Sequence, residues 1–133
     1  MLDKIKVIPC SGMGKVFGLI SREAALTVVN KLAPDKSETM CLAYIVTGDK
    51  EAKEQIQGKN CITLDGCPKM CAAKNVAIAG GIVKEEIRVV DAFKNHRGVK
   101  AGNATELTSD GWVIVDELGE MVVEKIKQIG EEE

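Results

Sequence analysis

The stretch that decides the fold of this chain runs Leu64-Asp65-Gly66-Cys67-Pro68-Lys69-Met70-Cys71-Ala72-Ala73-Lys74. The apolar run over 60–64 predicts a strand, Gly66 predicts a turn, and Pro68 is typical of a first helical position. Strand, turn and helix in this order form the repeating unit of parallel α/β sheets. The stretch therefore predicts an α/β fold with two thiols, Cys67 and Cys71, at a strand-to-helix connection.

The first third of the chain repeats this order. Residues 4–9 predict a strand that ends at Cys10, and a small glycine-bearing turn follows. Apolar residues recur at steps of three and four over 17–32, which predicts a helix. A charged helix is expected over 49–57 and ends at Gly58.

The segment 39–47 leaves two interpretations open. It could form one buried strand. Alternatively, a short strand ends near Cys41, and residues 42–45 already lead into a helix. The difference matters because Cys41 reaches the carboxyl end of the predicted sheet only if the strand is short.

The second half of the chain predicts three further elements and a loop. The helix after the opening stretch is expected over 68–79, and a strand is expected over 85–93. Residues 94–108 are polar and predict a loop. A last helix over 109–129 has one apolar stripe, and Trp112 near its start is expected to pack against the core.

This element order predicts a single-domain α/β fold over residues 1–130, with an acidic tail over 131–133. We expect a three-layer doubly wound sheet, mostly parallel, of about four strands and of the flavodoxin or Rossmann-like kind. In a flavodoxin-like order the first and third strands are neighbours. Cys10 and Cys67 then lie close together at the carboxyl ends of the strands, where such sheets bind ligands.

The composition narrows the classes of function. The 133 residues carry 18 basic and 20 acidic side chains, a net charge of −2, and so lack the excess of positive charge typical of nucleic-acid binding. No apolar run approaches the roughly 18 residues of a transmembrane helix, and residues 1–6 hold no long apolar region of the kind found in secretory signals. We therefore expect a cytoplasmic protein that binds neither nucleic acid nor membrane.

Five cysteines in such a chain favour metal ligands or redox thiols over structural disulfides. A helix N-terminus favours thiolate over thiol, and thiolates bind zinc. Cys10, Cys67 and Cys71 could supply three of the four ligands that zinc prefers, and Cys41 supplies the fourth if its strand is short. Cys61 lies at the opposite end of its strand and is expected to be a packing residue.

Other functions also fit the cysteines. Cys67 or Cys10 could attack as a thiolate in a redox or sulfur-transfer enzyme. Four thiolates also suit an iron–sulfur cluster. A partner-binding module that uses its metal as a staple is a further possibility. Among the other polar side chains, Asp65 is expected to cap or brace the turn, and His96 to be a surface residue. Asp91 is expected to be a carboxylate at the rim, at the end of the strand over 85–93.

Three cysteine motifs carry a resemblance to a known family. They are Pro9-Cys10-Ser11-Gly12, Met40-Cys41-Leu42-Ala43, and Asp65-Gly66-Cys67-Pro68 with Cys71-Ala72. Together they resemble the DGC-motif proteins, small prokaryotic proteins proposed to bind zinc because of their four cysteines. The resemblance covers roughly residues 5–95 with the motifs in the family's order. It implies a ligand set of Cys10, Cys41, Cys67 and Cys71 and no particular activity. After Cys41 the family tends toward a glycine-rich turn, whereas Tyr44-Ile45-Val46-Thr47 stands here.

Overall fold

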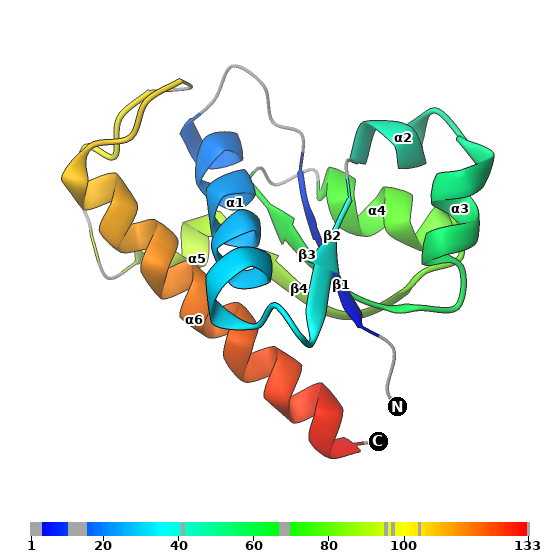
Figure 1. The fold of residues 1–133 in the computed structure, drawn as a ribbon. Helices are drawn as coiled ribbons and strands as arrows, with labels where there is room; N and C mark the ends of the chain where they lie inside the picture. The colour runs from blue at the N-terminus through cyan, green and yellow to red at the C-terminus, as the bar shows by residue number, and fades with distance from the viewer. Residues whose placement is uncertain are drawn as a thin grey trace.

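A computed structural model of the chain describes residues 4–10, 16–40, 42–66, 70–94, 96, 98–103 and 105–132. Its elements alternate between strands and helices along the chain (Figure 1). In order they are β1 (Ile5–Pro9), α1 (Val16–Thr27), the π-helix η1 (Val28–Leu32), β2 (Ser37–Thr39), α2 (Leu42–Val46), α3 (Lys50–Ile56), β3 (Asn60–Asp65), α4 (Cys71–Ile78), β4 (Ile82–Arg88), α5 (Val89–Phe93) and α6 (Ser109–Glu132).

The strands form one four-stranded sheet in the order β2-β1-β3-β4, and every pairing is parallel. Val7 of β1 pairs with Thr39 on one side and with Ile62 on the other. The predicted doubly wound α/β fold is confirmed, and so is the expectation that the first and third strands are neighbours. Their adjacent carboxyl ends form the edge of the sheet that we call the rim.

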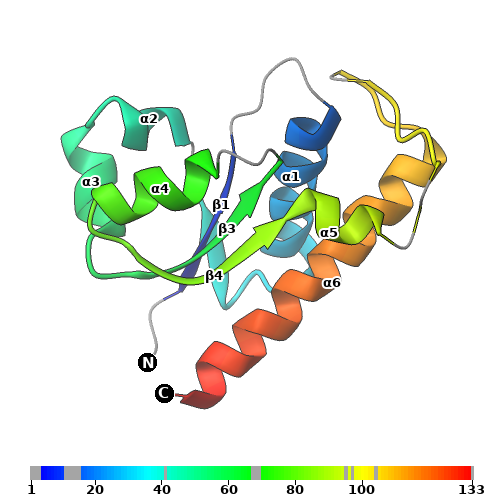
Figure 2. The ribbon, with the colours of Figure 1, turned by 180° about the vertical axis from the view of Figure 1, so that it is seen from behind.

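Helices cover both faces of the sheet, as the three-layer prediction requires (Figures 1 and 2). One face packs against α1, η1, α5 and α6, and the other packs against α2, α3 and α4. Neighbouring residues of a strand point to opposite faces, so Val7 and Ile8 belong to different cores. Both cores are built mainly from aliphatic side chains.

The long helix α6 covers its face of the sheet through the predicted apolar stripe. Five stripe residues are buried: Ile114, Leu118, Val122, Ile126 and Ile129. Met121 is the exception and is 36% exposed. The helix also continues through Gly130 to Glu132 rather than ending at Ile129. Within the described residues, no helix combines the length and the apolar character needed to cross a membrane.

The prediction of a strand over 85–93 is wrong at both ends. The strand β4 begins at Ile82 and stops at Arg88, and Val89–Phe93 forms the short helix α5. Val89 and Ala92 are both buried against the core that α6 covers. Residues three apart share one face of a helix, whereas in a strand they would point to opposite faces. Burial of both side chains therefore favours the helix.

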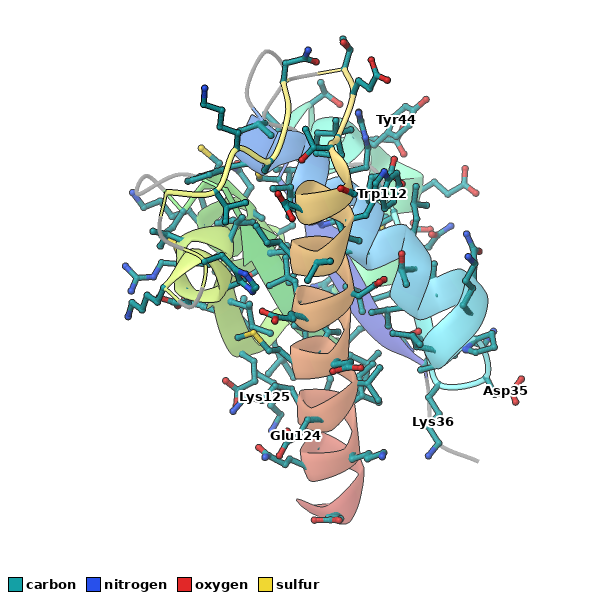
Figure 3. The ribbon with its side chains drawn as sticks, turned by 90° about the vertical axis from the view of Figure 1, so that its left-hand side faces the viewer. Asp35, Lys36, Tyr44, Trp112, Glu124 and Lys125 are labelled. Carbon is teal, nitrogen blue, oxygen red and sulfur yellow. The ribbon has the colours of Figure 1, made fainter. Side chains whose placement is uncertain are left out.

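The expectation that Trp112 packs against the core is also wrong. Its side chain is 46% exposed and lies near the first turn of α6 (Figure 3). Trp112 precedes the buried Ile114 by two residues, which corresponds to roughly 200° around a helix. The stripe that faces the sheet therefore turns Trp112 toward solvent.

The segment around residue 40 resolves in favour of the short strand. The strand β2 ends at Thr39, and α2 begins at Leu42. The predicted charged helix is α3, whose N-cap Asp49 accepts a hydrogen bond from the N–H of Ala52 at 2.9 Å. Capping of this kind satisfies an N–H group at the helix end that would otherwise lack a partner.

Candidate functional site

The rim brings the ends of β1 and β3 together around Cys10. Cys10 directly follows β1 and is 5% exposed. Its backbone N–H donates a hydrogen bond to the carbonyl oxygen of Leu64 at 2.8 Å. The pairing of β1 with β3 thus extends to Cys10, the first of the predicted ligands.

The sulfur of Cys10 is surrounded by hydrogen-bonding groups from two other segments. The backbone N–H of Gly66 donates a hydrogen bond to Cys10 Sγ at 3.1 Å. The hydroxyl of Ser21, in α1, lies 3.4 Å from the same sulfur and donates to the carbonyl oxygen of Gly18 at 2.8 Å. An N–H donor is a suitable partner for a thiolate, which is the form in which cysteine binds metal ions.

Gly66 approaches α1 too closely for any larger residue. A Cβ atom at this position would lie 2.9 Å from the carbonyl carbon of Phe17, 3.0 Å from its oxygen and 3.1 Å from the nitrogen of Gly18. All three are backbone atoms, which cannot turn aside as the end of a side chain can. The glycine of the opening stretch is therefore required by the contact between the turn after β3 and the start of α1.

Asp65, which was expected to cap or brace the turn, binds the start of the next helix across that turn. Its two carboxylate oxygens accept hydrogen bonds from the N–H of Ala72 at 2.8 Å and of Ala73 at 3.2 Å. Burial raises the pKa of this carboxyl, and the two N–H bonds act in the opposite direction. The carboxylate thus fixes the first turn of α4 to the end of β3.

The helix α4 begins at Cys71, three residues later than Pro68 had indicated. Met70, directly before it, has a left-handed backbone conformation with a φ of 55°. This conformation is not that of a right-handed helix, which agrees with the start of α4 at Cys71. Cys71 is exposed and is the first residue of α4.

Cys61 is confirmed as a packing residue. It has no solvent exposure and lies at the entering end of β3, where it pairs with Lys6 of β1. Its thiol donates to the carbonyl oxygen of Lys59 at 3.3 Å. Burial raises the pKa of the Cys61 thiol from 9.0 to about 11, although the nearby charge of Lys6 lowers it in part. Cys61 is therefore protonated at neutral pH.

The remaining polar candidates contact residues of nearby helices. His96 is partly buried, and its Nε2 lies 2.8 Å from Glu117 Oε2 of α6. Asp91 lies in α5 and not at the end of a strand, where the sequence predicts it, and its carboxylate is 3.5 Å from Arg88 and 3.3 Å from Lys94. The contacts of Asp91 with Arg88 and Lys94 are ion pairs of partly exposed side chains.

Two of the four predicted ligands, Cys41 and Cys67, lie outside the described residues. Lys15, between β1 and α1, and Lys69, between β3 and α4, could offset the charge of four thiolates. They lie outside the described residues as well. Among the residues that the structure does describe, no group of three His, Cys, Asp or Glu side chains gathers as a metal site. The four-cysteine ligand set therefore stays a prediction.

The sequence model of the DGC domain matches residues 6–118, from β1 into α6. The chain belongs to the DGC domain family. All five cysteines of this DGC domain lie within the matched range. Comparisons of the chain with curated proteins and with solved structures find no match. The membership confirms the resemblance drawn from the cysteine motifs and adds no activity to it.

Sequence reasoning missed one residue of this DGC domain, namely Ser21. A serine beside Arg22 is usually assigned to the solvent face of a helix, yet Ser21 has no solvent exposure. The signal was available in the spacing of Ser21, Ala25 and Val28, because steps of four and three place all three on one helix face. All of them are buried.

Proposed function

We propose that this DGC domain binds one zinc ion at the rim, through the sulfurs of Cys10, Cys41, Cys67 and Cys71. The observation that carries the proposal is the hydrogen bond from the Gly66 N–H to the Cys10 sulfur at 3.1 Å. This bond joins Cys10, which directly follows β1, to the turn that directly precedes Cys67. Metal–thiolate sites commonly have such donors to their sulfurs outside the ligand shell.

Two other observations support a site that is closed by four sulfurs. The strand β2 ends at Thr39, two residues before Cys41, which agrees with the short strand that this ligand needs. Cys71 is exposed at the start of α4 and so is accessible to an ion at the rim. Four thiolates leave no open coordination position, so the role would be structural, regulatory or metal handling rather than Lewis-acid catalysis.

The surroundings and chemistry of the cysteines also affect two other questions. One is whether the protein is a redox or sulfur-transfer enzyme, and the other is its cellular compartment. Cys10 is 5% exposed, which disfavours it as the attacking thiol of a redox or sulfur-transfer enzyme. Reduced thiolates persist in a reducing compartment, and the proposal accordingly includes the cytosol as the location. The metal ion is the partner that we propose.

Metal analysis of the protein purified without oxygen tests this function. We expect about one zinc ion per chain in the wild type and loss of that zinc in each of four variants, in which Cys10, Cys41, Cys67 or Cys71 is replaced by serine. Cys61→Ala is the matched control and should retain zinc, because Cys61 lies at the other end of β3. Protein without stoichiometric metal contradicts the proposal. A brown protein that contains iron and sulfide would show that the cysteines hold an iron–sulfur cluster and not zinc.

A further inference from the structure

The hydroxyl of Ser21 lies inside the protein at the sulfur of Cys10. Ser21 has no solvent exposure, and its neighbours Ile20 and Ala24 belong to the apolar core. Alanine has a higher helix propensity than serine and no polar atom to bury. Packing and helix formation alone therefore favour alanine at this position, so the hydroxyl calls for a reason beyond the fold.

The hydrogen bonds of this hydroxyl depend on the state of the sulfur. A serine has one O–H donor, and here it donates to the carbonyl oxygen of Gly18 at 2.8 Å. The oxygen of Ser21 also lies 3.4 Å from the sulfur of Cys10, and either atom can be the donor of this contact. When a metal ion binds, the S–H proton leaves to solvent and the sulfur becomes an acceptor. The Gly18 carbonyl still has its helical N–H partner, so the Ser21 hydroxyl can rotate and donate to the sulfur.

We propose that Ser21 is a positioning residue of the metal site, which donates a hydrogen bond to the metal-bound sulfur of Cys10. This inference rests on the proposed function and names a residue outside its ligand set. With the N–H of Gly66, the Ser21 hydroxyl gives the sulfur two donors from two different segments. Donors outside the ligand shell hold a ligand in its orientation and stabilise its charge.

Zinc affinity of Ser21→Ala, measured by competition with a chromogenic chelator, tests the inference. Ser37→Ala is the matched control, because Ser37 is also buried and also donates its hydroxyl to a backbone carbonyl, that of Ala33, at 2.7 Å. We expect Ser21→Ala to weaken zinc binding about tenfold and Ser37→Ala to leave it unchanged. Circular dichroism of both metal-free variants checks that they fold.

Cobalt(II) substitution supplies a readout that a purely structural role would not change. Loss of a donor to a thiolate raises the energy of its lone pairs, so the sulfur-to-cobalt charge-transfer band of Ser21→Ala should move to lower energy. Wild-type affinity together with a wild-type spectrum in Ser21→Ala overturns this inference and leaves the proposed function intact. A wild-type protein that binds neither zinc nor cobalt overturns both.

Discussion

At the scale of single residues, the surroundings of the two buried cysteines separate their roles. Cys10 Sγ accepts an N–H bond from Gly66 at the rim, whereas Cys61 donates its thiol proton to a carbonyl oxygen at the other end of β3. The first arrangement suits a ligand, and the second suits a thiol that keeps its proton. The partners of Cys10 thus agree with its proposed role as a ligand, and those of Cys61 agree with packing.

The raised pKa of Cys61 predicts a loss of stability in alkali. Below pH 9 the thiol is protonated in the folded and the unfolded chain. Between pH 9 and about 11 it ionises in the unfolded chain alone, which favours unfolding. The stability that the buried thiol contributes, about 3 kcal/mol by this linkage, is therefore lost as the pH rises through the folded pKa.

Urea unfolding of wild type and Cys61→Ala from pH 8 to pH 11 checks this prediction. Cys61→Ala leaves a cavity and is less stable at pH 8, but the gap between the two proteins should shrink as the pH rises. A gap in the free energy of unfolding that stays constant over this range would contradict the predicted shift.

At the scale of elements, the pair Asp65 and Gly66 joins three segments at the rim. Asp65 holds the start of α4, while Gly66 contacts both the Cys10 sulfur and the backbone of α1. The two residues thereby fix the position of the segment after β3 relative to Cys10 and α1. Any change that separates them would move Cys10 and Cys71, two of the four proposed ligands, relative to one another.

We expect Gly66→Ala to lower the free energy of unfolding by about 1 to 3 kcal/mol, because its Cβ would overlap backbone atoms of Phe17 and Gly18. Gly130→Ala is the matched control. A Cβ at Gly130 has no heavy atom within 4 Å, and alanine favours the helix by up to about 1 kcal/mol. Urea unfolding of both variants measures the difference. Equal effects of the two substitutions would show that the contact between turn and helix is not tight.

The bounds of the helices and strands also show which elements the sequence patterns predict correctly. Apolar spacing predicts α1 and α6 well, because each buries a long stripe against the sheet. It fails over 85–93, where burial of Val89 and Ala92 against α6 turns the chain into a helix. The start of α4 is set by the Asp65 carboxylate and the left-handed Met70, so Pro68 misplaces it. Both errors come from contacts between segments that local spacing does not contain.

The same limit applies to the candidate site. The order of the strands predicts that Cys10 lies at the rim beside the end of β3, and this is confirmed. The polar neighbours of its sulfur were not predicted, since Ser21 and Gly66 come from segments far apart in sequence. Tertiary packing alone brings them together.

At the scale of the whole molecule, the rim and the carboxyl-terminal turns of α6 lie at opposite ends. The helix starts on the rim side and runs past the amino ends of the strands (Figure 1). The ion pair between Lys125 Nζ and Glu85 Oε1, at 3.8 Å, links the later part of α6 to the edge strand β4. A zinc ion bound at the rim, as proposed, would therefore stabilise one end of the molecule directly and the other end through the sheet.

Hydrogen exchange with and without zinc makes this difference measurable. We expect zinc to slow exchange most at the N–H groups of Gly66, Ala72 and Ala73, which contact the rim residues. The exchange rates of the N–H groups of residues 127–132 should change little, except where exchange requires unfolding of the whole protein. Global stability should rise by about 2.7 kcal/mol at a free zinc concentration of 100 times Kd. Equal protection along the whole chain, or none, would contradict a site at the rim.

The parallel order of the sheet has a consequence for the way the chain folds. Val7 pairs with Thr39 and Ile62, so no pair of strands that the structure describes can form as a local hairpin. Each pairing waits for a crossover to close, which makes such sheets slow to assemble. Until β1 and β3 meet, the Cys10 sulfur lacks the N–H of Gly66 and is open to oxidants and to metal ions alike. The redox conditions and the zinc supply during synthesis should therefore decide how much of the protein reaches its native state.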